Sequence, residues 1–324
     1  MSAHISLQRR IDDYLAERRR LGFVLHSQDT FLTGFASFVA RRHHRGPLTV
    51  ELMSEWVRQG KDGQGSPETW TRRLGKLRSF IRYLKQFEPD TEVPDEAIFG
   101  EEPGRVAPHI YHDEEIVELL AAARQLGPHG SLRPMTFETL FGLMASTGMR
   151  VSEALNLRDD DVDLKHGMLT IRQTKFAKSR QLPLHPSTVT ALKHYRRQRA
   201  RYVTSTDDSP FLISSRGQGL GQPLGGRQAH RIFNALRDSM GWENRGAHEA
   251  PRLHDLRHTF AVRRMLLWYA DGTDIDRMML ALSTYMGHTK IVYTYWYLTA
   301  VPELMALAGG KFERFADIEG DNDE

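Results

Sequence analysis

The sequence contains no cysteine. This absence excludes disulfide bonds, zinc sites built on thiolates and a cysteine nucleophile. The chain also has no apolar run of 18 or more residues, and its first ten residues, Met-Ser-Ala-His-Ile-Ser-Leu-Gln-Arg-Arg, have no hydrophobic signal core. We therefore expect a cytoplasmic protein that does not enter a membrane.

Acidic residues are scarce in the first part of the chain. Residues 1–85 contain 16 Lys and Arg against eight Asp and Glu, a net charge of +8. Residues 86–115 contain one Arg against ten acids, a net charge of −9, and the remainder of the chain carries +4. A basic region, an acidic connector and a mildly basic region favour a polyanionic partner, although a solvated charged surface would have the same composition.

At 324 residues, 40% of them hydrophobic, the chain is long enough for about two domains with their own cores. Helical spacing predicts helices at residues 5–23, around 31–39 and at 49–58. A fourth begins after Ser66, with Pro67 at its first position. One face of this fourth helix is basic, so we expect it to contact nucleic-acid phosphates or to enter a groove, the alternative being a solvated face. The predicted DNA-binding residues are Arg72, Arg73, Lys76, Arg78 and Arg82.

Proline, glycine and acidic residues gather in residues 87–112. They predict an interdomain linker between a helical domain at 1–86 and a second domain at 113–324. The second domain has helical patterns at 113–126, 136–145, 186–202, 226–240, 255–270 and 274–286, and a β-hairpin pattern at 169–172 and 180–184. The predicted fold class is mainly α with a small β-hairpin or sheet (α+β), in two domains that can close around a duplex.

The second domain contains the groups that a protein needs to transfer a phosphodiester without a metal. Arg150 and Arg257 can hold the non-bridging oxygens, because a guanidinium donates paired hydrogen bonds and stays charged. A tyrosine can attack phosphorus and hold it covalently, while His and Lys move protons at the attacking and leaving oxygens. His254 lies three residues before Arg257, so the two share one face of a helix.

The run His254-Asp-Leu-Arg-His258 also has the i, i+4 histidines of a zinc-protease helix. That signature requires Glu after the first histidine, whereas this chain has Asp255, and it would place Arg257 against the metal. The sequence therefore favours phosphate over zinc. We expect no metal and no nucleotide cofactor.

Five motifs occur in order in the second domain. They are Thr147-Gly-Met-Arg150-Val-Ser-Glu153-Ala-Leu, the hairpin lysine Lys175, His254-x-x-Arg257, Gly287-His288 and Tyr297, nine residues after that histidine. Together they resemble the tyrosine recombinase (phage integrase) family over roughly residues 113–310, and the N-terminal region is similar to that family's helical core-binding domain. The resemblance implies a site-specific recombinase that cleaves and rejoins DNA through a 3′-phosphotyrosyl intermediate and a Holliday junction.

The resemblance implies six catalytic residues: Arg150, Lys175, His254, Arg257, His288 and Tyr297. The two arginines would clamp the phosphate, His254 would be a proton-transfer partner, and His288 would donate a hydrogen bond to the phosphate or shuttle a proton. The lysine would act as the general acid on the departing 5′ oxygen, with Lys178 as an alternative. The tyrosine would be the nucleophile.

Three tyrosines lie close together at this end of the chain. On one unbroken helix, nine residues would turn Tyr297 by about 180° away from His288, so we expect the helix to break near residues 287–290. Tyr293, Tyr295 and Trp296 are expected to be packing residues. The chain departs from the family pattern at residues 285–286 and 292–293, which leaves its subfamily open.

The resemblance also implies partners. They are double-stranded DNA with specific recombination sites, further copies of the chain in a homo-tetramer on synapsed DNA, and accessory DNA-binding proteins. We expect a monomer or weak oligomer in free solution, and a place on the bacterial nucleoid. The tail at residues 309–324 would either dock on a neighbouring protomer or complete its own core. Two other functions are considered. Relaxation of DNA, as in type IB topoisomerases, would use the same chemistry, whereas DNA binding by a catalytically silent regulator is disfavoured by the intact set of six residues.

Overall fold

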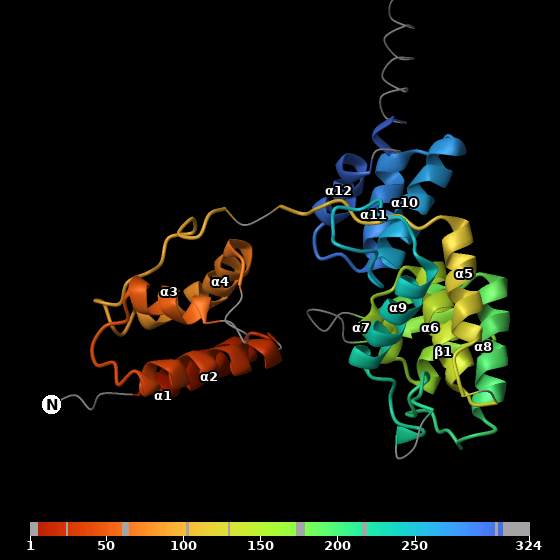
Figure 1. The fold of residues 1–324 in the computed structure, drawn as a ribbon. Coiled ribbons are helices and arrows are strands. Elements are labelled where there is room, and N and C mark those ends of the chain that lie inside the picture. The colour runs from red at the N-terminus through yellow and green to blue at the C-terminus, as the bar shows by residue number, and fades with distance from the viewer. Residues whose placement is uncertain are drawn as a thin grey trace, which may run out of the picture. The chain divides into compact units, whose positions relative to one another are not determined.

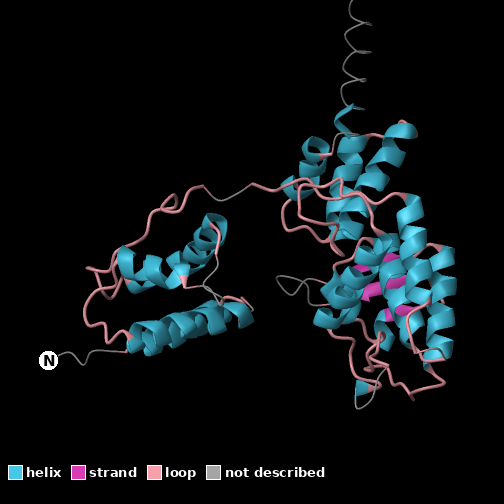
Figure 2. Ribbon diagram, in the orientation of Figure 1, coloured by secondary structure: helices cyan, strands magenta, loops and turns pink. Residues whose placement is uncertain are grey.

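The computed structural model describes residues 6–23, 25–59, 65–101, 104–128, 130–172, 179–215, 219–301 and 304–306. The chain divides into two compact units, Met1–Arg105 and Val106–Glu324, and each has hydrophobic core clusters of its own. The described elements are mainly helices, with a three-stranded sheet in the second unit (Figures 1 and 2). The predicted fold class, mainly α with a small sheet, is confirmed.

The described part of the first unit contains four helices: α1 (Leu7–Arg20), α2 (His26–Arg41), α3 (Val50–Arg58) and α4 (Pro67–Leu84). The Ser66 hydroxyl accepts a hydrogen bond from the Thr69 N–H, and Pro67 occupies the first turn of α4, as predicted. The apolar face of α4 is buried with side chains of the other helices. Leu74, Leu77, Phe80, Ile81 and Leu84 are buried in this core with Phe35 and Trp56.

The segment predicted to be a linker, residues 87–112, contributes to both units. Residues after α4 pack on the first unit, where Arg78 donates hydrogen bonds to the Pro94 and Asp95 carbonyls and Phe99 lies edge-on to Trp70. Farther along, the Ala107 carbonyl accepts a hydrogen bond from the second unit's Ala247 N–H. The division between the units lies between residues 105 and 106.

In the second unit, helices come both before and after the strands along the chain. Its elements are α5 (Asp113–Arg124), α6 (Arg133–Thr147), α7 (Val151–Leu155), a 3₁₀ turn (Asp159–Asp161), β1 (Val162–Asp163), β2 (Met168–Ile171), β3 (Arg180–Pro183), α8 (Pro186–Arg199), α9 (Gly226–Met240), α10 (Asp255–Ala270), α11 (Ile275–Met286) and α12 (Val292–Ala300). The strands pair antiparallel in the order β1-β2-β3, with Leu169 opposite Leu182. Both leucines are buried, which fixes the register of the pair.

Two clusters of buried apolar side chains organise the second unit. The larger lies among α5, α6, the sheet, α8 and α9, and the smaller among α10, α11 and α12. Figure 1 shows the ribbons of these elements. The smaller cluster includes Tyr297. None of the helices in the described ranges is long and apolar enough to cross a membrane.

Candidate active site

The junction between α6 and α7 places Arg150. Helix α6 ends at Gly148, whose φ of 61° is left-handed, and a Cβ at this position would collide with the Phe260 ring. Arg150 follows two residues later, and its N–H donates a hydrogen bond to the Glu153 carboxylate (2.9 Å), which closes the first turn of α7. The Arg150 side chain then reaches the Gly287 carbonyl, 3.0 Å from Nη2.

Arg257 lies in the first turn of α10 and is 2% exposed. Its guanidinium donates hydrogen bonds to the Gly148 carbonyl (2.7 Å) and to the Met286 carbonyl (2.6 Å). Burial, with the nearby charge of Arg150, lowers its pKa to about 10, so Arg257 remains charged at neutral pH. The two arginines therefore hold adjacent carbonyls, those of residues 286 and 287, and concentrate positive charge there.

His288 lies at a break between α11 and α12. Gly287 ends α11 in the left-handed conformation (φ 66°), and α12 begins at Val292. The predicted break near residues 287–290 is therefore confirmed. His288 Nδ1 is 2.7 Å from the Thr294 hydroxyl, a contact that orients the ring within the turn.

Tyr297 lies on α12 and is 2% exposed. Its hydroxyl is 2.8 Å from Nδ1 of His258, which is one helical turn beyond His254 on α10; the two imidazole rings are 5.0 Å apart. Burial, followed by Arg257 and Arg252, lowers the pKa of His254 to about 4. Burial, followed by His254 and Arg252, lowers the pKa of His258 to about 2. Both imidazoles are therefore neutral at pH 7, and each keeps one ring nitrogen that can accept a hydrogen bond.

His258 had no role in the phosphate chemistry predicted from the sequence. Its signal was the i, i+4 spacing from His254, which sequence analysis considered only for zinc. Among the residues that the structure describes, no group of three or more His, Asp or Glu side chains is placed to hold a metal ion. The second histidine instead contacts the tyrosine of α12.

Arg180, which the sequence did not single out, forms an ion pair with Glu153. Its Nη2 and Nη1 lie 2.8 Å and 3.1 Å from the two carboxylate oxygens, while Nη1 of Arg150 lies 2.7 Å from one of them. Burial disfavours the charged carboxylate, but the hydrogen bonds and charge of Arg180, then those of Arg150, outweigh burial and lower the pKa of Glu153 to about 2. The Glu153 carboxylate is thus shared between two guanidiniums, of which Arg180 is 11% exposed and Arg150 35% exposed.

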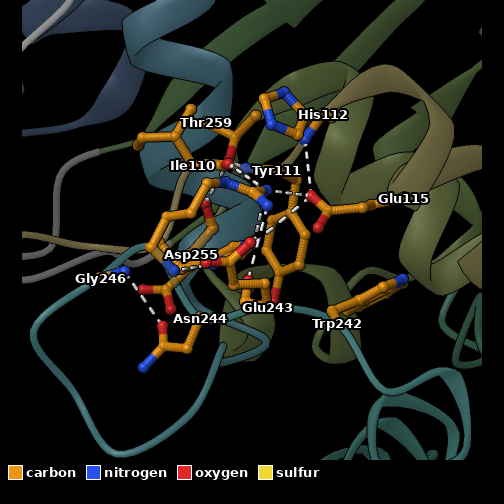
Figure 3. A network of polar contacts seen from close by, with 12 residues as sticks. Ile110, Tyr111, His112, Glu115, Trp242, Glu243, Asn244, Gly246, Asp255 and Thr259 are labelled. Carbon is orange, nitrogen blue, oxygen red and sulfur yellow. Dashed lines mark hydrogen bonds and ion pairs between the residues drawn. The ribbon is translucent and has the colours of Figure 1, made fainter.

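The first turn of α10 is held by Tyr111 and Arg252, which both precede it in the chain; Figure 3 shows Tyr111 beside Asp255 and Thr259 of this helix. Asp255, which is fully buried, pairs with the Arg252 guanidinium at 2.7 Å. The Tyr111 hydroxyl donates to the Arg252 carbonyl (3.0 Å), and the Tyr111 N–H donates to the Thr259 hydroxyl (2.9 Å). This network fixes the end of α10 that carries His254 and Arg257.

Lys175 and its alternative Lys178 lie outside the described residues, between β2 and β3. The other five predicted catalytic residues are described. The guanidiniums of Arg150 and Arg257 meet at the carbonyls beside His288, and the hydroxyl of Tyr297 is held by α10 through His258. The arrangement combines fixed positive charge with a phenol and neutral imidazoles, a set that can bind a phosphate and transfer it.

The predicted DNA-binding residues of α4 differ in their availability. Arg72, Lys76 and Arg82 are exposed, although Arg82 also pairs with Glu96. Arg73 is half-buried over the Trp56 ring, 4.9 Å from its centroid, and donates to the Trp56 carbonyl. Arg78 donates to two backbone carbonyls and to Glu96. Residues Arg72, Lys76 and Arg78 line a cavity of about 930 Å³ in the first unit.

Comparisons with known proteins give consistent results. The model of the phage integrase family matches residues 110–303. A Sinorhizobium fredii protein named integrase/recombinase y4rB is 38% identical over 307 residues, covering 94% of this chain and 96% of that protein. The tyrosine recombinase XerC of Thermodesulfovibrio yellowstonii is 28% identical over 256 residues, covering 78% of this chain and 76% of that protein.

Solved structures share the fold. The Tn1549 transposon integrase, in complex with transposon right end DNA, has a TM-score of 0.63 at 17% identity and covers 95% of this chain and 99% of its own. The XerH site-specific recombinase bound to palindromic difH substrate has a TM-score of 0.61 at 18% identity, covering 89% of this chain and 80% of its own.

Proposed function

Because the chain belongs to the phage integrase family, the tyrosine recombinases, we propose that Tyr297 attacks a DNA phosphate and holds the strand as a 3′-phosphotyrosyl bond. The protein is a site-specific recombinase that cleaves and rejoins DNA. The observation that carries the residue assignment is the meeting of the Arg150 and Arg257 guanidiniums at the carbonyls of residues 286 and 287, next to His288. Charge fixed there before DNA arrives needs little reorganisation when a phosphate binds.

The phosphate would be bound by Arg150, Arg257 and His288. A phosphodiester gains negative charge on its non-bridging oxygens as a fifth bond forms, and guanidiniums bind such oxygens through paired donors. Arg150, with 35% of its side chain exposed, can turn toward DNA. Arg257 is anchored by the Gly148 and Met286 carbonyls and supplies a positive charge that stays in place.

The covalent step would transfer two protons. A bond forms between the Tyr297 oxygen and phosphorus while the bond from phosphorus to the 5′ oxygen breaks. The phenolic proton passes to the two imidazoles of the α10 end, His258 Nδ1 lying 2.8 Å from the Tyr297 hydroxyl and the His254 ring 5.0 Å from that of His258, while the 5′ oxygen takes a proton from Lys175 or Lys178. Rejoining reverses these transfers with the 5′ hydroxyl of another strand. The phosphotyrosine retains the energy of the broken bond, so no ATP is needed.

We propose that four copies act together on two synapsed DNA sites. Exchange of all four strands between two duplexes requires four cleavages, and each copy supplies one nucleophilic tyrosine. Before they bind DNA, the copies would be monomers or weak oligomers. On the nucleoid, accessory DNA-binding proteins would bind beside them at some sites. Contacts made by the tail at residues 309–324, which lies outside the described residues, would link neighbouring copies.

The nucleophile is tested by trapping the covalent intermediate. Sequencing of the DNA covalently bound to the protein in cells identifies the site, which is then made as a nicked suicide substrate. In EDTA, the wild-type protein should form an adduct, whereas Tyr297→Phe should bind DNA normally and form none. Tyr295→Phe is the matched control, because the Tyr295 hydroxyl donates a hydrogen bond to the Asp276 carboxylate (3.1 Å) and not to His258. An adduct from Tyr297→Phe, with none from Tyr295→Phe, would overturn the assignment.

Relaxation of plasmids without a recombination site would instead indicate a topoisomerase. Dependence of the adduct on added Mg²⁺ would indicate a metal-dependent nuclease mechanism. Recombination between two copies of the trapped site, in EDTA and without nucleotide, is the result that the proposal requires.

A further inference from the structure

Arg180 joins three parts of the active site. It is the first residue of β3, the strand that follows residues 173–178 in the hairpin. Its Nε donates a hydrogen bond to the Tyr285 carbonyl in the last turn of α11 (2.8 Å). Its guanidinium also lies against Gly287, where an added Cβ would come within 2.7 Å of Nη1. The hairpin, the end of α11 and the turn before His288 are thereby held together.

Glu153 lies between Arg180 and Arg150. One carboxylate oxygen receives hydrogen bonds from both guanidiniums, at 3.1 Å from Arg180 and 2.7 Å from Arg150. The other oxygen receives one from Arg180 at 2.8 Å and one from the Arg150 N–H at 2.9 Å. Arg180 thus pairs with Glu153 in a bidentate way, whereas the Arg150 guanidinium contacts this carboxylate through Nη1 alone.

The two arginines differ in exposure. The Arg180 side chain is 11% exposed and that of Glu153 is 9% exposed, whereas the Arg150 side chain is 35% exposed. The largely buried carboxylate therefore has a largely buried partner, Arg180, that satisfies it. The more exposed guanidinium of Arg150 keeps hydrogen-bond donors and positive charge that can bind a second anion.

We propose that Arg180 is a positioning residue for strand cleavage, which satisfies Glu153 so that Arg150 stays available to the DNA phosphate. This inference rests on the proposed function and deepens it. Without Arg180, the buried carboxylate would keep its charge and would draw Arg150 into a two-pronged pair, because a buried anion without a partner is strongly unfavourable. Carboxylate and phosphate would then compete for one guanidinium.

The consequence is a specific pattern of rates. Arg180→Ala should lower the single-turnover cleavage rate on the suicide substrate by about 10- to 100-fold, as happens at metal sites when a residue that orients a metal ligand is removed. DNA affinity should change little, since Arg150 makes only one of many phosphate contacts. Arg180→Lys should be intermediate, because it keeps the charge and loses the paired donors.

The decisive measurement is a double-mutant cycle with Glu153→Gln. When the competing carboxylate is neutral, Arg150 no longer needs to pair with it, so Arg180→Ala combined with Glu153→Gln should cleave at least several-fold faster than Arg180→Ala alone. If Arg180 only braced the turn before His288, neutralising Glu153 would not restore the rate. A double variant no faster than Arg180→Ala, or an Arg180→Ala variant that cleaves at the wild-type rate, would overturn the inference.

Two controls distinguish failure of this inference from unfolding of a variant and from failure of the proposed function. Circular dichroism melting establishes that each variant is folded at the assay temperature, and Arg180→Gln, which retains a planar donor for the Tyr285 carbonyl, replaces Arg180→Ala if the latter does not fold. The proposed function is tested in the same assay by Tyr297→Phe with Arg180 unchanged. If the proposed function is wrong, Tyr297→Phe will still form an adduct, whatever the outcome of the double-mutant cycle.

Discussion

Replacing Gly148 by alanine is the sharpest test of how the end of α6 positions the arginine pair. Gly148 has a φ of 61°, and its carbonyl accepts a hydrogen bond from Arg257. An added Cβ would collide with the Phe260 ring and lie 3.1 Å from the sulfur of Met286. The same methyl group would therefore strain the backbone and displace side chains from α10 and α11.

The expected loss of stability follows from these two effects. Holding a non-glycine residue in the left-handed region is unfavourable by about 1 to 2 kcal/mol. Forcing a methyl group into a filled core is unfavourable by a further 1 to 3 kcal/mol or so. The sum, about 2 to 5 kcal/mol, corresponds to a decrease of roughly 4 to 20 °C in the melting temperature of a unit of this size.

Gly142→Ala is the matched control, six residues earlier in the same helix. Gly142 lies inside α6, and an added Cβ would lie 3.7 Å from Cδ2 of Leu120, an ordinary contact. Alanine in a helix interior is favoured over glycine by about 0.5 to 1 kcal/mol, so this variant should melt slightly higher.

Calorimetric melting of the two variants, with cleavage measured well below both melting temperatures, separates the predicted effects. Gly148→Ala should melt lower and should cleave slowly even while folded, because the carbonyl that anchors Arg257 is displaced. Gly142→Ala should cleave at the wild-type rate. If the two variants melt at the same temperature, or if Gly148→Ala cleaves normally, the reasoning about this turn is wrong.

Two further predictions concern pH and DNA binding. The pKa values of His254 and His258 are lowered to about 4 and about 2 from an ordinary value of 6.5, so the unfolded chain binds protons first as the pH falls below 6.5. Urea denaturation should therefore show stability falling between pH 7 and pH 5, by up to about 2 kcal/mol per histidine, and His258→Gln should remove about half of that decrease; an unchanged pH dependence in His258→Gln would contradict the assignment. Replacing Arg72 and Lys76 by alanine should weaken DNA binding and reduce the salt slope by about 0.9 per lost phosphate contact, whereas Arg78→Ala, whose guanidinium is engaged within the first unit, should change the slope less. An unchanged slope in the double variant would mean that this face of α4 is only solvated.

Much of the fold could be predicted from the sequence because its signals are local. The cap at Ser66 and Pro67 marks the start of α4, and the spacing of apolar residues locates the long helices within a few residues. The break after α11 follows from the requirement that His288 and Tyr297 face one site, and Gly287 provides the conformation that the break needs. Five short motifs, in order, were sufficient to predict the family.

Short elements had no such signal. Helix α7 has five residues and β1 has two, which is too short for a hydrophobic period to be recognised. The segment at residues 87–112 was predicted to be a linker from its prolines and acids. Its packing on both units depends on contacts with residues far away in the sequence, such as Trp70 and Ala247.

The sequence by itself determined which chemical groups are present: two arginines, two histidines, a lysine and a tyrosine at spacings that a helical fold can bring together. Only the tertiary structure decided how each is held. Arg180 meets the Tyr285 carbonyl across 105 residues, and His258 meets Tyr297 across 39. Backbone carbonyls are present at every residue, so composition cannot reveal which of them an arginine will reach. The physical reason is that the availability of a charged group depends on its burial and its partners, which exist only once the distant segments have packed.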